Sequence, residues 1–263
     1  MLTAVKNQIK VTLLSFKYDL MKSMLNKVSF LSNVIFMIFN NASFLILWVI
    51  FYSLKDNIGG ATIKDVFLLW GLSAGSYGLS HVIFNSAYNL GAQITNGKLD
   101  AYLVQPKNVL LGSISGVSPS AIGDILYAYI LLVVSRLTIK KFVLYTLFMI
   151  TGSLILTAVA VIVGSLSFWI TNSEAISSSI NGMMTQFSTY PEGIFSKNVK
   201  ILLYCVIPVG YAVYLPVSII NAFNLNTFII TLGITVLLVV VSFIVFYKGL
   251  RKYSSSNLMI AKI

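Results

Sequence analysis

Polar side chains recur at helical spacing in two otherwise apolar segments of this chain. In the later segment they follow steps of four, three, four and three residues: Glu174, Ser178, Asn181, Thr185 and Ser188. The earlier segment has a similar series: Ser73, Tyr77, His81, Asn85 and Tyr88. Such steps place side chains on one face of a helix, so the two faces predict the walls of a central passage for a moderately polar or amphipathic compound. The alternative is that these groups only hydrogen-bond neighbouring helices, at about 0.6 kcal/mol each.

Two ionisable residues stand alone inside apolar segments. Asp124 lies within residues 117–134. A carboxylate at the centre of a bilayer costs about 2.5 to 3.5 kcal/mol, so we expect a partner or a bound proton, and a functional and a structural role both remain open. His81 is the only histidine and makes no metal site by itself, which favours a hydrogen-bonded packing role. With the single Cys205, the sequence offers no nucleophile and base or metal cluster, so we expect no enzyme.

The composition predicts an integral membrane protein. The 263 residues are 57% hydrophobic and 10% charged, with a mean hydropathy of +0.90, whereas a soluble domain typically carries about 25% charged residues. The net charge of +11 is concentrated in short loops and at the two ends, which favours contact with anionic lipid over nucleic acid. We therefore expect a single transmembrane domain over residues 1–263.

The expected fold is all-α, with six spans, each needing roughly 20 apolar residues to cross a bilayer. The spans are residues 29–54, 66–90, 117–134, 142–170, 175–190 and 227–247. Before them, apolar residues and lysines alternate at helical spacing over residues 1–28, which predicts an amphipathic helix in the membrane interface. A cytosolic surface helix is the alternative there. Four spans thus fall within residues 29–171, and the remainder within 172–263.

The region before the last span is the least regular. The fifth span is short and rich in Ser, Thr, Asn and Gln, so it sits among other helices, lines a cavity, or does not cross. After it, residues 191–223 predict a broken, re-entrant helical hairpin, which membranes tolerate where it is packed in protein or faces water. Its helix-breaking residues are Pro191, Gly193, Pro208, Gly210 and Pro216. If this segment crossed as a seventh span, the termini would lie on opposite sides.

Basic residues favour both termini in the cytoplasm. That orientation places eleven of them, including Lys262, inside and seven, including Arg136, outside. The loop 135–141 is more basic than is usual for an outside loop. Sixteen lysines against two arginines suggest an AT-rich genome, and hence a bacterial plasma membrane.

The connection between the second and third spans reads TNGKLDAYLVQPKNVLL, residues 95–111. Leu99, Tyr102 and Leu103 fall on one helical face, and Pro106 ends the helix. Lys98 and Asp100 flank that face. A short helix near 97–106 with an apolar face and a charged rim suits contact with a cytoplasmic partner. The alternative is an ordinary loop helix packed under the bundle.

The segment GKLDAYLVQPKN, followed downstream by YPEGIF and VIPVGYAVYLP, resembles the permeases of type-2 ATP-binding-cassette exporters. The resemblance is to the subfamily whose second intracellular loop reads roughly G-x-L-D-x-x-L-x-x-P, and it extends over nearly the whole chain. It implies that two permeases, identical or related, form a dimer. It also implies that each permease receives a separate ATP-hydrolysing subunit.

The resemblance assigns roles to residues of this chain. The loop after the second span would enter a groove on the ATPase through Gly97, Lys98, Leu99, Asp100, Leu103 and Pro106. The hairpin 191–223 would close the exit as an extracellular gate, and the spans that carry the two polar faces would meet at the dimer interface. No G-x-x-x-x-G-K-[ST] run occurs in the sequence, so ATP and Mg are expected on the partner subunit and no cofactor on this chain.

The expected function is that of a permease subunit in an ATP-driven exporter that moves an amphipathic substrate outward by alternating access. The family handles drugs, peptides, glycans and lipids, and the sequence does not choose among them. An ATP-independent secondary transporter or channel is the alternative. Such proteins usually carry paired ionisable residues at mid-membrane, whereas here Asp124 is accompanied only by Glu174, near the edge of a span.

Overall fold

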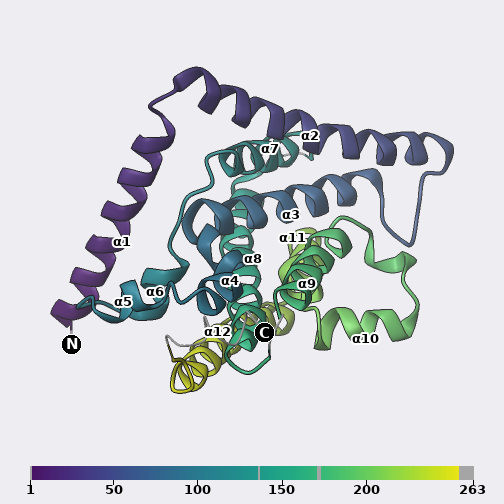
Figure 1. Ribbon diagram of the computed structural model, residues 1–263. Helices are drawn as coiled ribbons and strands as arrows, with labels where there is room; N and C mark the ends of the chain where they lie inside the picture. The colour runs from purple at the N-terminus through teal and green to yellow at the C-terminus, as the bar shows by residue number, and fades with distance from the viewer. Residues whose placement is uncertain (1, 136, 171–172, 255–263) are drawn as a thin grey trace.

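The protein is a bundle of helices (Figure 1). The computed structural model describes residues 2–135, 137–170 and 173–254. Within these ranges every named element is helical, and the only β-type pairings are two isolated bridges. The predicted all-α class is therefore confirmed for the described residues. Arg136 and Lys262, which entered the charge argument, lie outside them.

The first two helices, α1 (Leu2–Ser23) and α2 (Lys27–Leu54), meet at a sharp bend. Asn26 begins α2 as its N-cap, where its side chain accepts a hydrogen bond from the Ser29 amide at 3.0 Å. In Figure 1, α1 stands apart from the bundle and runs across the direction of α2. A helix that lies in the membrane interface has this relation to a helix that crosses it.

Three helices form the core: α3 (Ile63–Phe84), α7 (Ala121–Val134) and α8 (Ile139–Ser165). Small residues allow their close approach. A Cβ atom added at Gly71 or Gly75 would lie 2.3 or 2.6 Å from side-chain atoms of α8, and one at Gly78 would lie 2.7 Å from the Ala121 carbonyl oxygen of α7.

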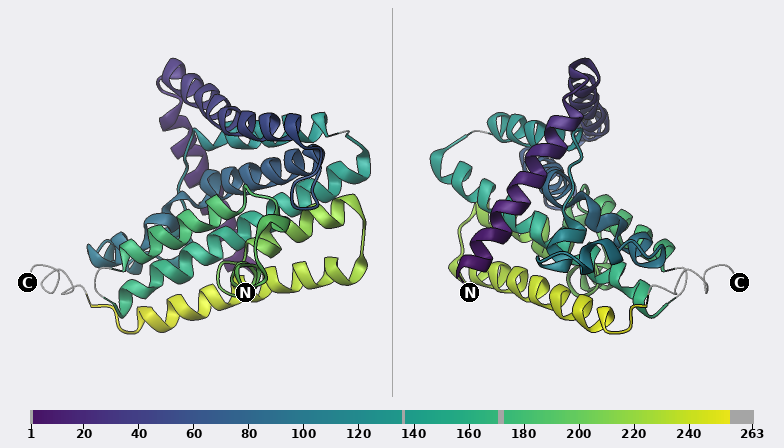
Figure 2. Two further views of the ribbon diagram at one scale, coloured as in Figure 1. Left: turned by 90° about the vertical axis from the view of Figure 1, so that its right-hand side faces the viewer. Right: turned by 60° about the vertical axis from the view of Figure 1, so that its left-hand side comes forward.

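The outer helices α2 and α12 (Leu225–Leu250) cover this core. In the most apolar stretch of the segment around α3, 78% of the residues are buried, and the share is the same in α8. In the corresponding stretches of α2 and α12, only 17% of the residues are buried. Figure 2 shows α12 (yellow) running along one side of the bundle with α8 beside it. The exposed apolar side chains of α2 and α12 suit contact with lipid.

Four helical segments of the described chain are long and apolar enough to cross a bilayer: Lys27–Leu54, Ile63–Thr95, Ile139–Phe168 and Leu225–Leu250. They match the first, second, fourth and sixth predicted spans. The third and fifth are shorter than a span, because α7 and α9 (Glu174–Phe187) contain 14 residues each and rise about 21 Å. Pro119 precedes α7 and Pro191 follows α9, and proline disfavours helix in the residue before it.

The broken hairpin predicted from the sequence lies between α9 and α12. Its elements are η3 (Glu192–Ile194), α10 (Lys197–Cys205), the π-helical turn η4 (Gly210–Tyr214) and α11 (Leu215–Asn221). The two arms meet at 85° and would add a fifth span if counted as one. Gly193 touches Gly59 where the hairpin begins, and Asn221 donates a hydrogen bond to Asp65 at 2.6 Å where it ends. Both contacts lie where α3 begins, so the hairpin starts and ends at one end of the bundle.

Short helices occupy the opposite end of the bundle. They are η1 (Asn85–Asn89), α4 (Leu90–Thr95), α5 (Asp100–Leu103), α6 (Val109–Ile114) and η2 (Leu166–Phe168). Gly97, with φ of 69°, ends α4: its amide donates to Ile94 at 3.2 Å and the Lys98 amide donates to Gln93 at 2.9 Å. The helix predicted near 97–106 is therefore reduced to the four residues of α5.

Candidate functional site

An open groove of about 610 Å³ lies between α2, α3, α7 and α9. Its volume falls within the range of small-molecule sites, roughly 300 to 1,000 Å³. Both of the elements on which the sequence places a polar face, α3 and α9, contribute to it. The groove is therefore the first candidate site.

Part of the groove wall is polar. Asn41 of α2 donates to the Oδ1 atom of Asp124 at 2.6 Å and to the Met37 carbonyl oxygen at 3.1 Å. Asp124 is only 2% exposed, and its Oδ2 atom has no hydrogen-bond partner among the described residues. The other polar lining residues are Asn40, Ser73, Tyr77, Thr185, Gln186 and Thr189. The wall thus presents amide and hydroxyl groups around one carboxyl group.

The remaining wall is largely aromatic. Its rings are Phe44, Trp48, Phe51, Trp70, Tyr77 and Tyr190. Trp48 meets Tyr190 edge to face at 5.7 Å, and Trp70 stacks with Phe44 at 6.3 Å. The indole Nε1 of Trp70 is buried and has no partner within the described part of the chain. The groove therefore combines polar groups with broad apolar surfaces.

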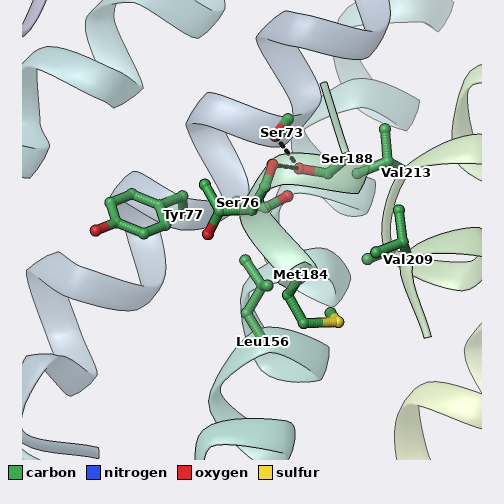
Figure 3. A pocket seen from close by; sticks show the side chains of 10 residues that line it. Ser73, Ser76, Tyr77, Leu156, Met184, Ser188, Val209 and Val213 are labelled. Atoms are coloured by element: carbon green, nitrogen blue, oxygen red, sulfur yellow. Dashed lines mark hydrogen bonds between the residues drawn. The ribbon is translucent and has the colours of Figure 1, made fainter. Parts of the chain in front are cut away.

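Next to the groove, a cavity of about 10 Å³ marks the joint between α3, α8, α9 and η4. Figure 3 shows the hydrogen bond between the Ser73 and Ser188 hydroxyl groups, 2.5 Å apart, which joins α3 to α9. Val209 and Val213 approach from the hairpin, and Met184 lies on the α9 side. The hairpin thus packs where the two polar faces meet.

Only some residues of the two predicted polar faces line the groove. Ser73, Tyr77 and Thr185 line the groove. His81 is stacked between the rings of Tyr77 and Tyr88, at 3.8 and 3.9 Å, and its Nδ1 atom lies 3.0 Å from the Tyr77 carbonyl oxygen. This position agrees with the packing role favoured for His81.

The other predicted pathway residues lie away from the groove. Glu174 and Ser178 are exposed and Asn181 is half-buried, all on α9. Asn85 lies in η1, where its backbone N–H donates a hydrogen bond to the Gly116 carbonyl oxygen at 3.1 Å. Ser188 is buried, and its hydroxyl group is hydrogen-bonded to that of Ser73. This is the arrangement expected if these polar groups serve contacts between helices.

The sequence analysis missed the contribution of α2. Asn40 and Asn41 stand together in a span that carries no charge, and this pair was a visible signal. Gln186 and Thr189 were also missed, because each follows a residue of the predicted α9 face by one position. The aromatic wall gave no signal, since Trp and Phe are common in lipid-facing spans.

The second candidate site lies at the end of the bundle with the short helices. Leu99 is fully buried there in an apolar cluster, hereafter the Leu99 cluster: Ala87, Leu90, Ile94, Leu99, Leu110, Ile114, Ala160, Val161, Phe168 and Phe246. This corrects the expectation that Leu99 shares an exposed apolar face with Tyr102 and Leu103. The turn at Gly97 directs Leu99 inward, Tyr102 packs at the edge of the cluster, and Leu103 and Val104 stay 44% and 84% exposed.

Two charged residues of the same loop, Lys98 and Asp100, are also exposed, as is Pro106. The Tyr253 hydroxyl, beyond the end of α12, donates to the Asp100 carboxylate at 2.9 Å, and its ring meets Phe168 edge to face at 6.2 Å. The pKa of Tyr253 is raised to about 12, mainly by partial burial and then by its hydrogen bond to Asp100 and the negative charge of that residue. The phenol therefore keeps its proton at neutral pH and donates a hydrogen bond to Asp100.

A family model described as ABC-2 family transporter protein matches residues 23–257. The chain belongs to this family. Among curated proteins and solved structures, none matches it significantly. The matched residues include the groove, the Leu99 cluster and the hairpin.

Membership of the ABC-2 family confirms the broader predictions. The chain is a multi-pass membrane protein and a transport component of the permease type. ABC-2 permeases associate with ATP-binding-cassette ATPases, and the permease domain is not itself catalytic. The loop-motif subfamily, the direction of transport and the roles of individual residues remain predictions.

The hairpin of this ABC-2 chain places its predicted gate residues in two environments. Pro191, Pro208, Gly210 and Pro216 are buried, and a Cβ atom on Gly210 would lie 2.2 Å from the Tyr204 ring. Gly193 is exposed but touches the Gly59 backbone, where an added Cβ would lie 1.6 Å from its carbonyl oxygen. The hairpin is thus closely packed at its turn and at its entry.

Proposed function

We propose that this chain is the membrane-spanning permease subunit of an ATP-driven exporter that moves an amphipathic substrate outward by alternating access. The observation that carries the proposal is the position of Leu99. It anchors the loop that exposes Leu103 and Val104 into a cluster built from the ends of three long helical segments, around α3, α8 and α12. A push on the exposed pair therefore reaches three helices through packed side chains.

The ATPase binds the exposed end of this loop in the proposed exporter. Leu103 and Val104 provide an apolar contact, and Lys98 and Asp100 provide a charged rim. Gly97 sets the turn, Leu99 anchors it and Pro106 ends it. ATP and Mg are held by the ATPase subunit, and this chain binds neither.

In the membrane, we propose six crossings with both termini in the cytoplasm of a bacterial cell. The short helices α7 and α9 cross with the help of the segments that follow or precede them. α7 packs against α2 and α3, and α9 packs along one side against α8. The hairpin re-enters the membrane from the outside. This placement is supported by the two ends of the hairpin, which lie beside Gly59 and Asp65, where α3 begins. This placement puts the Leu99 cluster at the cytoplasmic end.

A second permease, identical or related, completes the passage. Much of α2 and α9 is exposed next to the groove, so a partner there would enclose it. The proposed path includes the predicted residues that line the groove, together with Asn40, Asn41 and Asp124. The hairpin, with its buried prolines and glycines, closes the outer end and responds to movement at the joint of Ser73 and Ser188.

The test uses the ATPase that co-purifies with the wild-type chain from its native membrane. We expect the double variant Leu103→Ser, Val104→Ser to lose at least ten-fold of the bound ATPase, because the apolar contact is removed without touching the buried Leu99. The control is Leu25→Ser, at a side chain that is 85% exposed in the bend between α1 and α2. Unchanged ATPase binding and ATP-driven transport in the double variant would disprove the coupling surface. Transport by the chain alone, without ATP, would favour the secondary transporter or channel.

A further inference from the structure

The groove has an electrostatic character opposite to that of the whole chain. The protein carries a net charge of +11, yet Asp124 is the one charged residue among the described residues that line the groove. Asn41 contacts only its Oδ1 atom, and Oδ2 has no partner in the described structure. Because Asp124 is 2% exposed, water screens its ionised form little, and a cation in the groove interacts with that form strongly.

The aromatic wall adds a second recognition element. The faces of Trp, Tyr and Phe rings attract cations that lie over them, and the attraction grows when water is excluded. Trp48 and Tyr190 meet at one end of the groove, and Trp70 and Phe44 stack within it. These rings also offer apolar surface to the uncharged part of a ligand.

The spacing of the polar groups indicates the size of the ligand. Asp124 packs against Gly78 of α3, where a Cβ atom would lie 2.8 Å from the Asp124 Cβ. Trp70, whose Nε1 donor lacks a partner within the described residues, precedes Gly78 by eight positions, which corresponds to about 12 Å along the helix. A ligand that extends from Asp124 to the Trp70 ring is therefore a drug-sized molecule rather than an inorganic ion.

We infer that the groove binds an amphipathic organic cation, with Asp124 as the anionic anchor and the Trp48, Trp70 and Tyr77 rings as the apolar and cation-binding wall. The inference rests on the proposed export function and names its substrate class. An organic anion is disfavoured because the carboxyl group repels it. An uncharged sugar is disfavoured because it gains no ion pair with Asp124.

The test compares two ions of the same shape and opposite charge. Tetraphenylphosphonium and tetraphenylborate are offered to the wild-type chain in lipid nanodiscs, and binding is measured by equilibrium dialysis after subtraction of empty nanodiscs. We expect the wild type to bind the phosphonium at least ten times more tightly than the borate. Equal binding of the two ions would overturn the inference without any variant.

Two pairs of variants locate the preference. Asp124→Asn should reduce the preference for the cation at least ten-fold, whereas Asp56→Asn, which removes the same charge from the exposed loop between α2 and α3, should leave it unchanged. Gln186→Lys adds a positive charge at an exposed groove position and should weaken phosphonium binding at least five-fold. Ser179→Lys adds it at an exposed position of α9 that does not line the groove and should have no effect.

The Gln186 pair keeps the inference testable if Asp124→Asn does not fold, because both of its positions are exposed. Wild-type preference that survives in a folded Asp124→Asn variant, or that responds equally to Gln186→Lys and Ser179→Lys, would contradict the assignment. The measurement needs no ATP. A chain that couples ATP hydrolysis but shows no cation preference would therefore disprove only this inference, and a cation-selective chain that never binds an ATPase would disprove only the export function.

Discussion

The Leu99 cluster and the groove lie in the same bundle but are built on opposite principles. In the cluster, buried aliphatic and aromatic side chains of the short helices pack against those at the ends of α8 and α12. In the groove, about 610 Å³ stays open between four helices. Of the three buried polar side-chain atoms without a partner in the described structure, Trp70 Nε1 and Asp124 Oδ2 belong to residues that line the groove, and Ser76 Oγ belongs to a residue that lines the small cavity beside it.

The difference in packing suits the two regions to different roles in a transporter. A close-packed cluster moves as a unit, because its side chains have no free volume into which to relax. A groove with free volume and unpaired polar groups can accept a ligand and change shape. The packing therefore suits the cluster to transmit movement and the groove to receive a substrate.

The largest expected effect is a difference in stability between alanine variants at Leu99 and Leu103, which belong to the same loop. Leu99→Ala should lower the free energy of unfolding by about 2 to 5 kcal/mol, because it leaves a cavity in a filled cluster. Leu103→Ala, at an exposed position of the same loop, should change it by less than about 0.5 kcal/mol while weakening ATPase binding. Denaturant titration in mixed micelles measures both. Equal losses of stability would show that Leu99 and Leu103 share one environment.

A second expectation concerns the wall that separates the groove from the core. Gly78→Ala places a methyl group 2.7 Å from a backbone oxygen of α7 and 2.8 Å from Asp124, and such overpacking typically costs about 1 to 3 kcal/mol of stability. It should also weaken the cation preference, since it displaces the carboxyl group. The control is Gly233→Ala on α12, where an added Cβ meets nothing within 4 Å.

At Gly233, alanine should leave the preference unchanged and stabilise the protein by up to about 1 kcal/mol, through helix propensity alone. A destabilised Gly78→Ala variant with an intact cation preference would separate the packing of α3 on α7 from the ligand site. Equal stability of the two alanine variants would contradict the close approach of the helices.

The long elements could be predicted from the sequence because each depends on its own residues. Long, mainly apolar runs predicted α2, the span around α3, α8 and α12, and the prolines and glycines of residues 191–223 predicted the broken hairpin. The fifth span was already short in the sequence, as α9 is, but the length of α7 could not be read from hydropathy. Residues 117–120 read Val-Ser-Pro-Ser and carry no charge, so they were counted within the third span. Pro119 and the bond from the Ser118 amide to the His81 carbonyl oxygen hold them outside the helix.

The candidate sites were only partly predictable, because they depend on which helices are neighbours. Helical spacing identified Ser73, Tyr77 and Thr185, but it could not show that Ser188 would be used in a bond to Ser73. Nor could it show that Asp124 would face Asn41, 83 positions earlier in the chain. Leu99 was placed on an exposed face because the αL turn at Gly97, which reverses its direction, has no signature in hydropathy.

The smallest expected effect concerns the polar edge of the Leu99 cluster, where Tyr253 binds Asp100. Tyr253→Phe removes the hydrogen bond but keeps the ring against Phe168, so it should cost about 0.5 to 1.5 kcal/mol of stability near pH 8. Tyr247→Phe on α12, a matched removal of one hydroxyl group, should cost less than about 0.5 kcal/mol.

The difference between wild type and Tyr253→Phe should also depend on pH. The folded-state pKa of Tyr253 is about 12, above the ordinary value near 10 that applies in the unfolded chain. The contribution of its hydroxyl group is therefore fully present below pH 10 and is lost as the pH rises from 10 towards 12. Unfolding titrations of both proteins at pH 8, 10 and 11 cancel the ionisation of the lysines that they share. A difference that stays constant to pH 11 would show that Tyr253 does not donate to Asp100, and the packed cluster would then hold the loop without a polar link to the end of α12.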